Sequence, residues 1–202
     1  MKNLNKYITE AERAFGITKY ISEAERIPRL HGYITEKFRL SKDNLEHHYN
    51  YHPKTRVEFI KLIDKLIEER GNDADLNDID TSAINDMSKV FYYTKFNGDI
   101  SGWDVHNVVY MDNMFEESEF NGDISKWDVS NVETMKWMFA ESKFNGDISK
   151  WDVSNVESMN GMFYKSKFNR DISKWNVNNV EDMSMMFDYS PLEKNPPKWY
   201  KK

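Results

Sequence analysis

Residues 120–132 read FNGDISKWDVSNV, and residues 144–156 read FNGDISKWDVSNV again. The identity belongs to a longer 24-residue period, in which thirteen positions are the same in all four copies. The copies begin at Phe96, Phe120, Phe144 and Phe168, and each carries one tryptophan in the same place: Trp103, Trp127, Trp151 and Trp175. A period this strict predicts that the copies are structural units that stack on one another.

The period continues in a weaker form on both sides of the four copies. Upstream, residues 72–95 keep six positions in register, namely Asp75, Leu76, Ile79, Ile84, Met87 and Phe91. Downstream of Ser190, Leu192 falls in the phenylalanine position and Trp199 in the tryptophan position. We therefore expect a degenerate first copy, four regular copies and a closing half-copy.

One copy has too few apolar residues to form a core alone, so the copies must share one by stacking. Residues 124–129 favour an extended stretch, because Ile, Trp and Val suit strands. Residues 134–142 favour a helical turn, because Met135, Met138 and Phe139 have the i, i+3, i+4 spacing of one helical face. The predicted fold class is an α/β solenoid with one short parallel strand and one helical turn per 24-residue copy.

The repeated stretch also resembles a known family. FNGDISKWDVSNV followed by MKWMFAES is similar to the BspA-like leucine-rich-repeat-type repeats, which have the form F-N-x-D-I-S-x-W-D-V-S-N-V-x-x-M-x-x-M-F. The resemblance covers residues 72–191. It implies a leucine-rich-repeat-like right-handed superhelix, and members of that family are commonly bacterial surface or interaction proteins.

The stretch before the repeats predicts a capping helix within residues 46–71. In PKTRVEFIKLIDKLIEERG (53–71), Thr55 and Glu58 form a capping box, and Gly71 marks the C-terminal stop. An apolar stripe follows the helical period: Val57, Ile60, Ile63, Leu66 and Ile67. Because the end of a solenoid exposes its first apolar layer, we expect this helix to cover the N-terminal end of a solenoid over residues 72–202, with the tail around Trp199 closing the other end.

The first 45 residues hold a second, shorter repeat. KYITEAERAFGIT (6–18), KYISEAERIPRLH (19–31) and GYITEKFRLSKDN (32–44) align with a period of 13. Capping boxes predict short helices, which are marginal alone in water and must dock on something. Two interpretations stay open, a binding element displayed several times and a linker whose copies arose by duplication. The motif resembles short segments attached to gut-bacteriophage proteins, which would make the chain phage-encoded or host-interaction related.

Composition excludes several classes of protein. The net charge of −6 disfavours a nucleic-acid binder, because such proteins collect basic residues. The chain has no cysteine, so disulfides and thiolate chemistry are ruled out. No run of 18 apolar residues predicts a membrane span, and MKNLNKYITEAERAFG lacks the apolar region of a signal peptide. We expect a cytoplasmic or virion-associated protein, with surface display less favoured.

The polar positions that repeat have both a chemical and a structural interpretation. Asp99, Asp123, Asp147 and Asp171 with their neighbouring asparagines suggest a calcium turn, yet they offer too few carboxylates per turn, and Asn-Gly-Asp also makes an ordinary turn. Asn107, Asn131, Asn155 and Asn179 predict a ladder that satisfies turn backbone in a dry core. His47, His48 and His52 suggest a transition-metal site without carboxylate partners. No histidine is in register with the repeated serines to activate them, so we expect no enzyme, no cofactor and no metal.

The positions that vary between copies are the candidate binding residues. They cluster around the expected helical turn, and large groups occupy several of them: Tyr110, Trp137, Tyr164, Met185 and Tyr189. Aromatic residues and methionine are enriched at interface cores, although unconstrained positions also drift. We therefore predict a non-enzymatic protein-interaction scaffold that binds a partner protein through this edge. The alternative is a surface adhesin or carbohydrate-binding module, assisted by calcium.

Overall fold

The computed structural model describes residues 49–201, which belong to a unit that begins at Tyr49. The preceding unit, Met1–His48, lies outside the described residues. The predictions for the 13-residue motifs and for His47 and His48 therefore concern a part of the chain that the structure does not describe. All structural statements below refer to residues 49–201.

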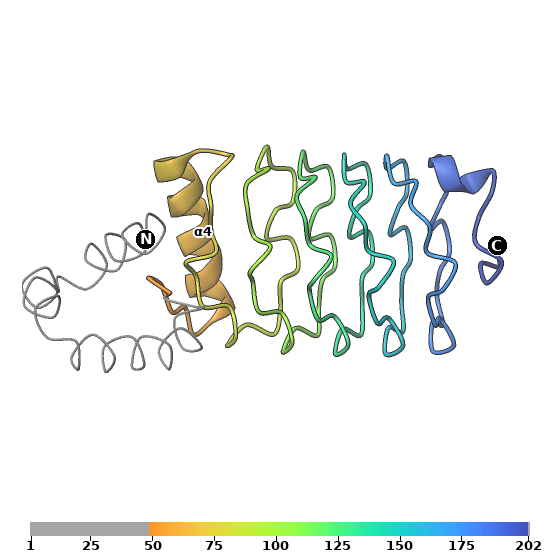
Figure 1. The fold of residues 1–202 in the computed structure, drawn as a ribbon, viewed down its shortest axis with the longest axis horizontal. Helices are drawn as coiled ribbons and strands as arrows, with labels where there is room; N and C mark the ends of the chain where they lie inside the picture. Colours follow the sequence, from red (N-terminus) through yellow and green to blue (C-terminus); the bar gives the residue numbers. More distant parts are fainter. Residues whose placement is uncertain (1–48, 202) are drawn as a thin grey trace, which may run out of the picture. The chain divides into compact units, whose positions relative to one another are not determined.

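Helix α4 (Arg56–Arg70) lies at the N-terminal end of the repeats (Figure 1). The Oγ1 atom of Thr55 accepts a hydrogen bond from the N–H of Glu58 at 3.2 Å, as the capping box predicts. The carboxylate of Glu58 accepts from the N–H of Lys54 rather than from that of Thr55. The apolar stripe differs from the prediction at its first residue, because Val57 is 62% exposed and Phe59 is buried in its place.

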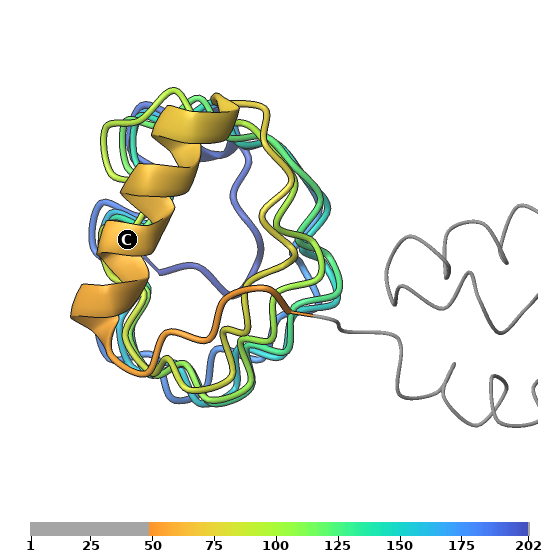
Figure 2. The ribbon, with the colours of Figure 1, turned by 90° about the vertical axis from the view of Figure 1, so that its left-hand side faces the viewer.

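The 24-residue copies lie side by side in a row, with α4 at one end and the C-terminal tail at the other (Figure 1). Seen along the row, the copies superimpose on one another (Figure 2). Parallel single-residue bridges link equivalent positions, such as Asp86 with Tyr110 and Tyr110 with Thr134. We call the copies coils, numbered from the N-terminal end: coil 1 (72–95), coil 2 (96–119), coil 3 (120–143), coil 4 (144–167) and coil 5 (168–191).

The predicted α/β solenoid is wrong. Within residues 49–201, α4 is the only α-helix and lies before the first coil. The other helix is the short 3₁₀ segment η1 (Pro191–Glu193), which follows coil 5. The coils contain isolated bridges but no strand, so neither the strand nor the helical turn of each copy is present. For the same reason, the leucine-rich-repeat-like superhelix that the resemblance implies is also wrong.

Left-handed residues explain why no helical turn forms. We call the five equivalent stretches 87–93, 111–117, 135–141, 159–165 and 183–189 the Met–Phe segments. In every segment the third and seventh residues have φ between 50° and 61°. An α-helix needs negative φ at each residue, so two left-handed residues four apart interrupt it. The ten positions are Lys89, Asn113, Trp137, Gly161, Met185, Tyr93, Glu117, Glu141, Lys165 and Tyr189.

The backbone hydrogen bonds of the Met–Phe segments run mainly between coils. The N–H groups of Met111, Asn113 and Phe115 donate to carbonyls of coil 3 at 3.0, 2.8 and 2.8 Å. The N–H groups between them close turns within their own coil, as Met114 does onto the carbonyl of Met111 at 3.3 Å. These donors are therefore paired without the i to i−4 bonds of a helix.

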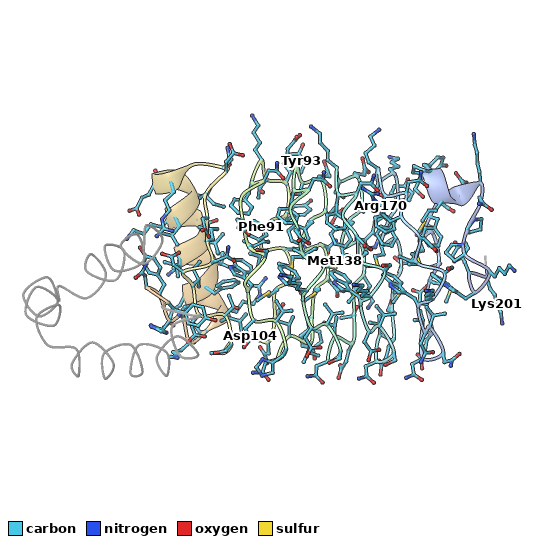
Figure 3. All side chains as sticks on the ribbon, viewed as in Figure 1. Phe91, Tyr93, Asp104, Met138, Arg170 and Lys201 are labelled. Atoms are coloured by element: carbon cyan, nitrogen blue, oxygen red, sulfur yellow. The ribbon has the colours of Figure 1, made fainter. Side chains whose placement is uncertain are left out.

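Stacked aromatic rings fill the core that the coils share. Along the column that begins with Phe96, successive ring centroids lie 6.2–6.3 Å apart and the rings are nearly parallel. A second column begins with Phe91 and has spacings of 5.5–5.9 Å. Figure 3 shows Phe91 and Met138 pointing inward and Tyr93 at the outer margin. Dispersion and apolar burial between identical rings thus hold each coil to the next.

The tryptophan column adds a hydrogen bond at each step. From Trp103 to Trp199, every indole N–H donates to a leucine or isoleucine carbonyl of the preceding coil at 3.0–3.2 Å. Trp199 takes the next place in the column after Trp175, with ring centroids 6.4 Å apart, as its spacing predicts. Because the bond reaches a buried carbonyl 27 residues away, it fixes the register between coils.

Aspartates shape the turns on the outside of the coils. The Oδ1 atom of Asp123 accepts from the N–H of Ser125 at 2.9 Å, and Asp152 does the same with Ser154 at 3.0 Å. These bonds hold the pKa of both carboxyl groups below the ordinary aspartate range. The repeated aspartates therefore have the turn-forming role that was set against calcium binding.

We expect Trp151→Phe to lower the free energy of unfolding by about 2–3 kcal/mol, because it removes the indole N–H that donates to the carbonyl of Ile124 and puts a smaller ring into a packed core. Lys150→Ala, on the exposed neighbouring residue, is the control and should change stability by less than about 0.5 kcal/mol. Urea denaturation followed by circular dichroism measures both. Equal effects of the two variants would contradict a structural role for the indole N–H.

The aspartate turns predict loss of stability in acid. Since the pKa of Asp128 and Asp152 is lower in the folded chain, their ionised forms stabilise the fold. That stabilisation is complete above the unfolded pKa of about 3.9 and is lost as the pH falls through the lower folded pKa. Asn176 already occupies the equivalent place in coil 5 and accepts from Asn178.

Replacing both aspartates by asparagine keeps the acceptor but removes the titration. We expect the double variant Asp128→Asn, Asp152→Asn to show a smaller drop in Tm between pH 7 and pH 3 than the parent chain. Differential scanning calorimetry at both pH values measures the drop. An unchanged pH dependence would show that acid acts elsewhere.

Candidate interaction edge

The structure brings three of the five predicted binding residues together. The rings of Trp137 and Tyr164 meet edge to face with centroids 5.3 Å apart, and those of Tyr164 and Tyr189 meet at 5.6 Å. Trp137 and Tyr164 are half-buried, whereas Tyr189 is 70% exposed. These three residues, one from each of coils 3, 4 and 5, form a continuous row that we call the aromatic edge.

The other two predicted residues lie apart from that row. Tyr110 is 45% exposed and takes part in the parallel bridges at the start of a Met–Phe segment. Met185 is 41% exposed and occupies the same position in coil 5 as Trp137 does in coil 3. Among the described residues, Tyr110 makes no ring contact with the aromatic edge, so the ring contacts join only three of the five.

Two members of the aromatic edge stand at left-handed positions. Trp137 has φ 55° and Tyr189 has φ 61°. For residues other than glycine and asparagine this conformation costs about 1–2 kcal/mol, because Cβ approaches the carbonyl oxygen. The chain places asparagine and glycine at the same position as Trp137 in other coils, namely Asn113 and Gly161. The aromatic residues are therefore held in conformations that smaller residues would adopt more easily.

Gly161 provides the space for the tryptophan ring. A Cβ atom at Gly161 would lie only 2.7–2.8 Å from ring carbons of Trp137. Gly161 also has φ 61°, which glycine adopts without strain. The indole of coil 3 therefore lies directly over the backbone of coil 4, beside Tyr164. Variation at this pair of positions was visible in the sequence, but the dependence of Trp137 on Gly161 was not.

Ion pairs between neighbouring coils flank the aromatic edge. Lys165 pairs with Glu141 at 3.4 Å, and its Nζ lies 5.1 Å from the ring centre of Tyr164. The hydrogen bond to Glu141 raises the pKa of Lys165. Lys143 pairs in the same way with Glu119. These lysine and glutamate charges therefore neutralise each other in pairs, and the aromatic rings distinguish this surface.

Sequence reasoning missed two exposed tyrosines in coil 1. Tyr92 is 42% exposed and Tyr93 is 69% exposed, with ring centroids 6.1 Å apart. Tyr93 stands at the same left-handed position as Tyr189, four coils away. The register of residues 72–95 carries this signal, because Tyr93 falls at the position of Tyr189 in the 24-residue period.

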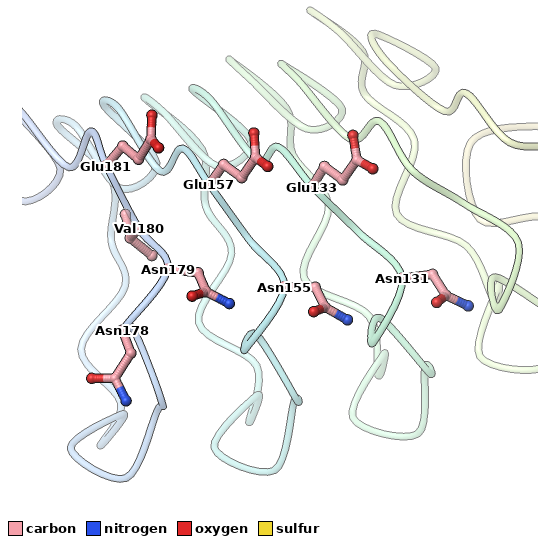
Figure 4. A pocket seen from close by; sticks show the side chains of 8 residues that line it. All are labelled: Asn131, Glu133, Asn155, Glu157, Asn178, Asn179, Val180 and Glu181. Atoms are coloured by element: carbon pink, nitrogen blue, oxygen red, sulfur yellow. The ribbon is translucent and has the colours of Figure 1, made fainter.

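A second surface feature is a hollow of about 510 Å³ on coils 3 to 5. Figure 4 shows a row of glutamates beside a row of asparagines on this surface. Its lining residues are Asn131, Glu133, Asn155, Glu157, Asn178, Asn179, Val180 and Glu181. The asparagines form the predicted ladder, since the Nδ2 atom of Asn155 donates to the carbonyl of Ser130 at 2.7 Å. The ladder is exposed rather than buried in a dry core, which corrects that part of the prediction.

Residues 49–201 contain neither a cluster of metal-binding side chains nor a helix suited to cross a membrane. No group of three or more His, Asp or Glu side chains in this part of the chain is arranged to hold a metal ion. His52, from the predicted cluster, instead contacts Asp80 at 3.1 Å. None of the helices described has both the length and the apolar character needed to cross a membrane.

Comparison with known proteins identifies a family. A family model described as "Mycoplasma protein of unknown function, DUF285" matches residues 62–167 and 140–201. The chain belongs to this family. The matched residues include the end of α4, all five coils and the tail. No curated protein and no solved structure matches the chain.

We expect Gly161→Ala to destabilise the chain by about 1–2 kcal/mol, because its Cβ would clash with Trp137 and because φ is positive. In a Trp137→Ala background the clash is gone, so the same substitution should cost less. A double-mutant cycle by urea denaturation measures this coupling. Equal costs in the two backgrounds would show that Gly161 serves the backbone alone.

Proposed function

We propose that this chain is a non-enzymatic protein-interaction module that binds a partner protein through the aromatic edge of Trp137, Tyr164 and Tyr189. The observation that carries the proposal is the continuous contact of three aromatic rings on three successive coils. Aromatic residues grouped in this way are typical of the energetic centres of protein interfaces.

The backbone conformation of the edge supports the proposal independently. Trp137 and Tyr189 occupy left-handed positions where glycine or asparagine would make the fold more stable. A large ring at such a position reduces stability, and binding provides a reason to keep it. Gly161, which leaves room for the indole, fits the same explanation.

The ring geometry favours a protein partner over a carbohydrate. Trp137 and Tyr164 are inclined by 67°, and Tyr164 and Tyr189 by 89°. Rings that stack on sugars must present their flat faces to solvent, whereas these rings turn edges and faces toward one another. Protein side chains of varied shape fit such an irregular row better than a run of sugar rings does.

The serine column supports a non-enzymatic role. Ser118, Ser142, Ser166 and Ser190 are all buried and bond the turn backbone, as the Oγ atom of Ser142 does with the carbonyl of Phe139 at 2.8 Å. They are therefore structural hydroxyls. The resemblance to BspA-like repeats is consistent with an interaction role. A cytoplasmic or virion-associated location stays part of the proposal, together with the absence of nucleic-acid partners.

The decisive experiment is a pull-down from the native host with mass spectrometry, comparing the parent chain with Trp137→Glu and Tyr164→Glu. We expect both substitutions to reduce capture of the specific partner at least tenfold, since each places a charge among the contacting rings. Tyr110→Glu is the matched control, because Tyr110 is a similarly exposed tyrosine away from the aromatic edge. It should capture the partner normally.

The melting temperature of each variant separates binding from folding. We expect the Tyr164→Glu variant to melt within a few degrees of the parent chain, because Tyr164 is only half-buried. Tyr189→Asn should raise stability by up to about 1 kcal/mol while weakening capture, because asparagine adopts positive φ more readily. Undiminished capture by the well-folded Tyr164→Glu and Tyr189→Asn variants would overturn the proposal.

A further inference from the structure

The tail covers only part of the C-terminal end of the row. Trp199 stacks on Trp175, and the ring of Tyr200 meets that of Phe187 edge to face at 4.9 Å. The tail therefore covers the tryptophan side of coil 5. Val177, Val180 and Met183 are only partly buried, although the residues at these positions in coil 4 are at most 1% exposed.

A row of backbone donors runs along the Met–Phe segment of coil 5. In coil 4 the N–H groups of Met159, Gly161 and Phe163 donate to coil 5 carbonyls at 2.8–2.9 Å. The equivalent N–H groups in coil 5 have no acceptor within residues 49–201; they belong to Met183, Met185 and Phe187. We call these three N–H groups, with Val177, Val180, Met183 and Met185, the open edge.

The row of donors ends where the chain supplies its own acceptor. The carboxylate of Glu193, just after coil 5, accepts from the N–H of Tyr189 at 3.0 Å. At the N-terminal end, α4 packs Phe59 against Trp103 and lies across one side of coil 1 (Figure 2). Within residues 49–201, the Met–Phe segments therefore leave this row of unpaired donors at the C-terminal end. An unpaired edge of this kind is a template for the addition of another segment.

A second copy of the described unit does not satisfy this edge. Two copies joined through their open edges would place N–H donors opposite N–H donors. Joined head to tail, the open edge would meet α4, whose Arg56 already donates to the carbonyl of Ser88 in coil 1. The acceptors must therefore come from a segment whose carbonyls recur every second residue.

The charge beside the open edge defines the segment further. Glu181 and Asp182 are exposed next to Val180, and Glu133 and Glu157 continue the row across the hollow (Figure 4). The backbone bond from the N–H of Glu181 to the carbonyl of Glu157, at 2.7 Å, holds these like charges in line. None of the three glutamates pairs with a cation within residues 49–201. A lysine or arginine at that end of the added segment would relieve their repulsion.

We propose that the open edge binds a segment of another protein that carries apolar residues and a lysine or arginine, and that adds to coil 5 through its backbone carbonyls. The open edge shares no residue with the aromatic edge, although Tyr189 follows it in coil 5, and this proposal does not depend on the proposed function. The added segment would take the place that coil 5 takes on coil 4.

A probe for the experiment comes from the chain itself. Residues 133–142, ETMKWMFAES, include the carbonyls that accept from coil 2 in the folded chain. Two synthetic peptides are compared, this sequence and its Glu133→Lys form, KTMKWMFAES. Each is titrated into the ¹⁵N-labelled full chain, and amide hydrogen exchange is followed by NMR.

We expect the lysine peptide to slow exchange of the Met183, Met185 and Phe187 amides at least tenfold at saturation. The glutamate peptide should bind at least tenfold more weakly, because it adds a carboxylate beside Glu181. In the chain alone these three amides should exchange faster than those of Met159, Gly161 and Phe163, which are already bonded.

Val180→Glu should abolish binding of the lysine peptide to the open edge. Val109→Glu is the matched control, because Val109 occupies the glutamate position of coil 2. Tyr164→Glu should leave peptide binding unchanged, which keeps this test independent of the proposed function. Melting curves confirm that each variant is folded.

Four results would overturn the proposal. The first is equal binding of the two peptides, and the second is binding that survives Val180→Glu. The third is protection of the three amides in the chain alone with a rise in mass by light scattering, which would assign the edge to a second copy. Failure of the lysine peptide to alter the three amides at millimolar concentration would also reject it.

Discussion

The structure depends on one constraint: alternate backbone N–H groups of each Met–Phe segment must find carbonyls on the next coil. Met111, Asn113 and Phe115 show the pattern, with N–H groups that donate two residues apart. The intervening N–H groups close local turns, which require left-handed residues at the third and seventh positions. Side chains then recur in register, so identical rings stack and each indole reaches the carbonyl of the coil before it. Backbone pairing and core packing therefore impose the same period.

This pairing explains why the apolar spacing was misleading. Met135, Met138 and Phe139 have the i, i+3, i+4 spacing of a helical face, and all three are buried. A succession of tight turns can bring the same positions inward. Each tight turn spans about three to four residues, so its period is close to that of a helix. Periodicity reports which side chains face the core but not the sign of φ. Asn113 and Gly161 were the available clues, since both residue types favour left-handed conformations.

Much of the packing was accessible from the sequence because repetition reveals which positions are constrained. The phenylalanine, tryptophan and methionine columns are core, and the extension to Trp199 follows from spacing alone. The capping of α4 by Thr55 was equally readable, since the interaction is local. The failure at Val57 and Phe59 has a different cause. The face of a helix that is buried depends on where its neighbour lies, and here Trp103 contacts Phe59.

The candidate sites were less predictable, because they depend on contacts between coils. Variation between copies identified Trp137, Tyr164 and Tyr189, but only the structure shows that they touch while Tyr110 does not join them. The open edge left no sequence signal, since Val177 and Val180 belong to columns that are buried elsewhere.

The direction of the hydrogen bonds gives the two ends of the row different chemistry. Along the Met–Phe segments, each coil donates toward the C-terminal end and accepts on the other side. The first coil therefore presents carbonyls and the last coil presents N–H groups. A charged side chain pairs with one backbone group at each end. Arg56 of α4 donates to the carbonyl of Ser88 at the N-terminal end, and Glu193 accepts from the N–H of Tyr189 at the C-terminal end. A cation suits the acceptor end and a carboxylate the donor end for the reason that governs the two ends of a helix. In this row, Glu193 accepts from the last donor, the N–H of Tyr189. The common direction of the hydrogen bonds between coils therefore leaves the other N–H groups of the row, those of the open edge, for an added segment.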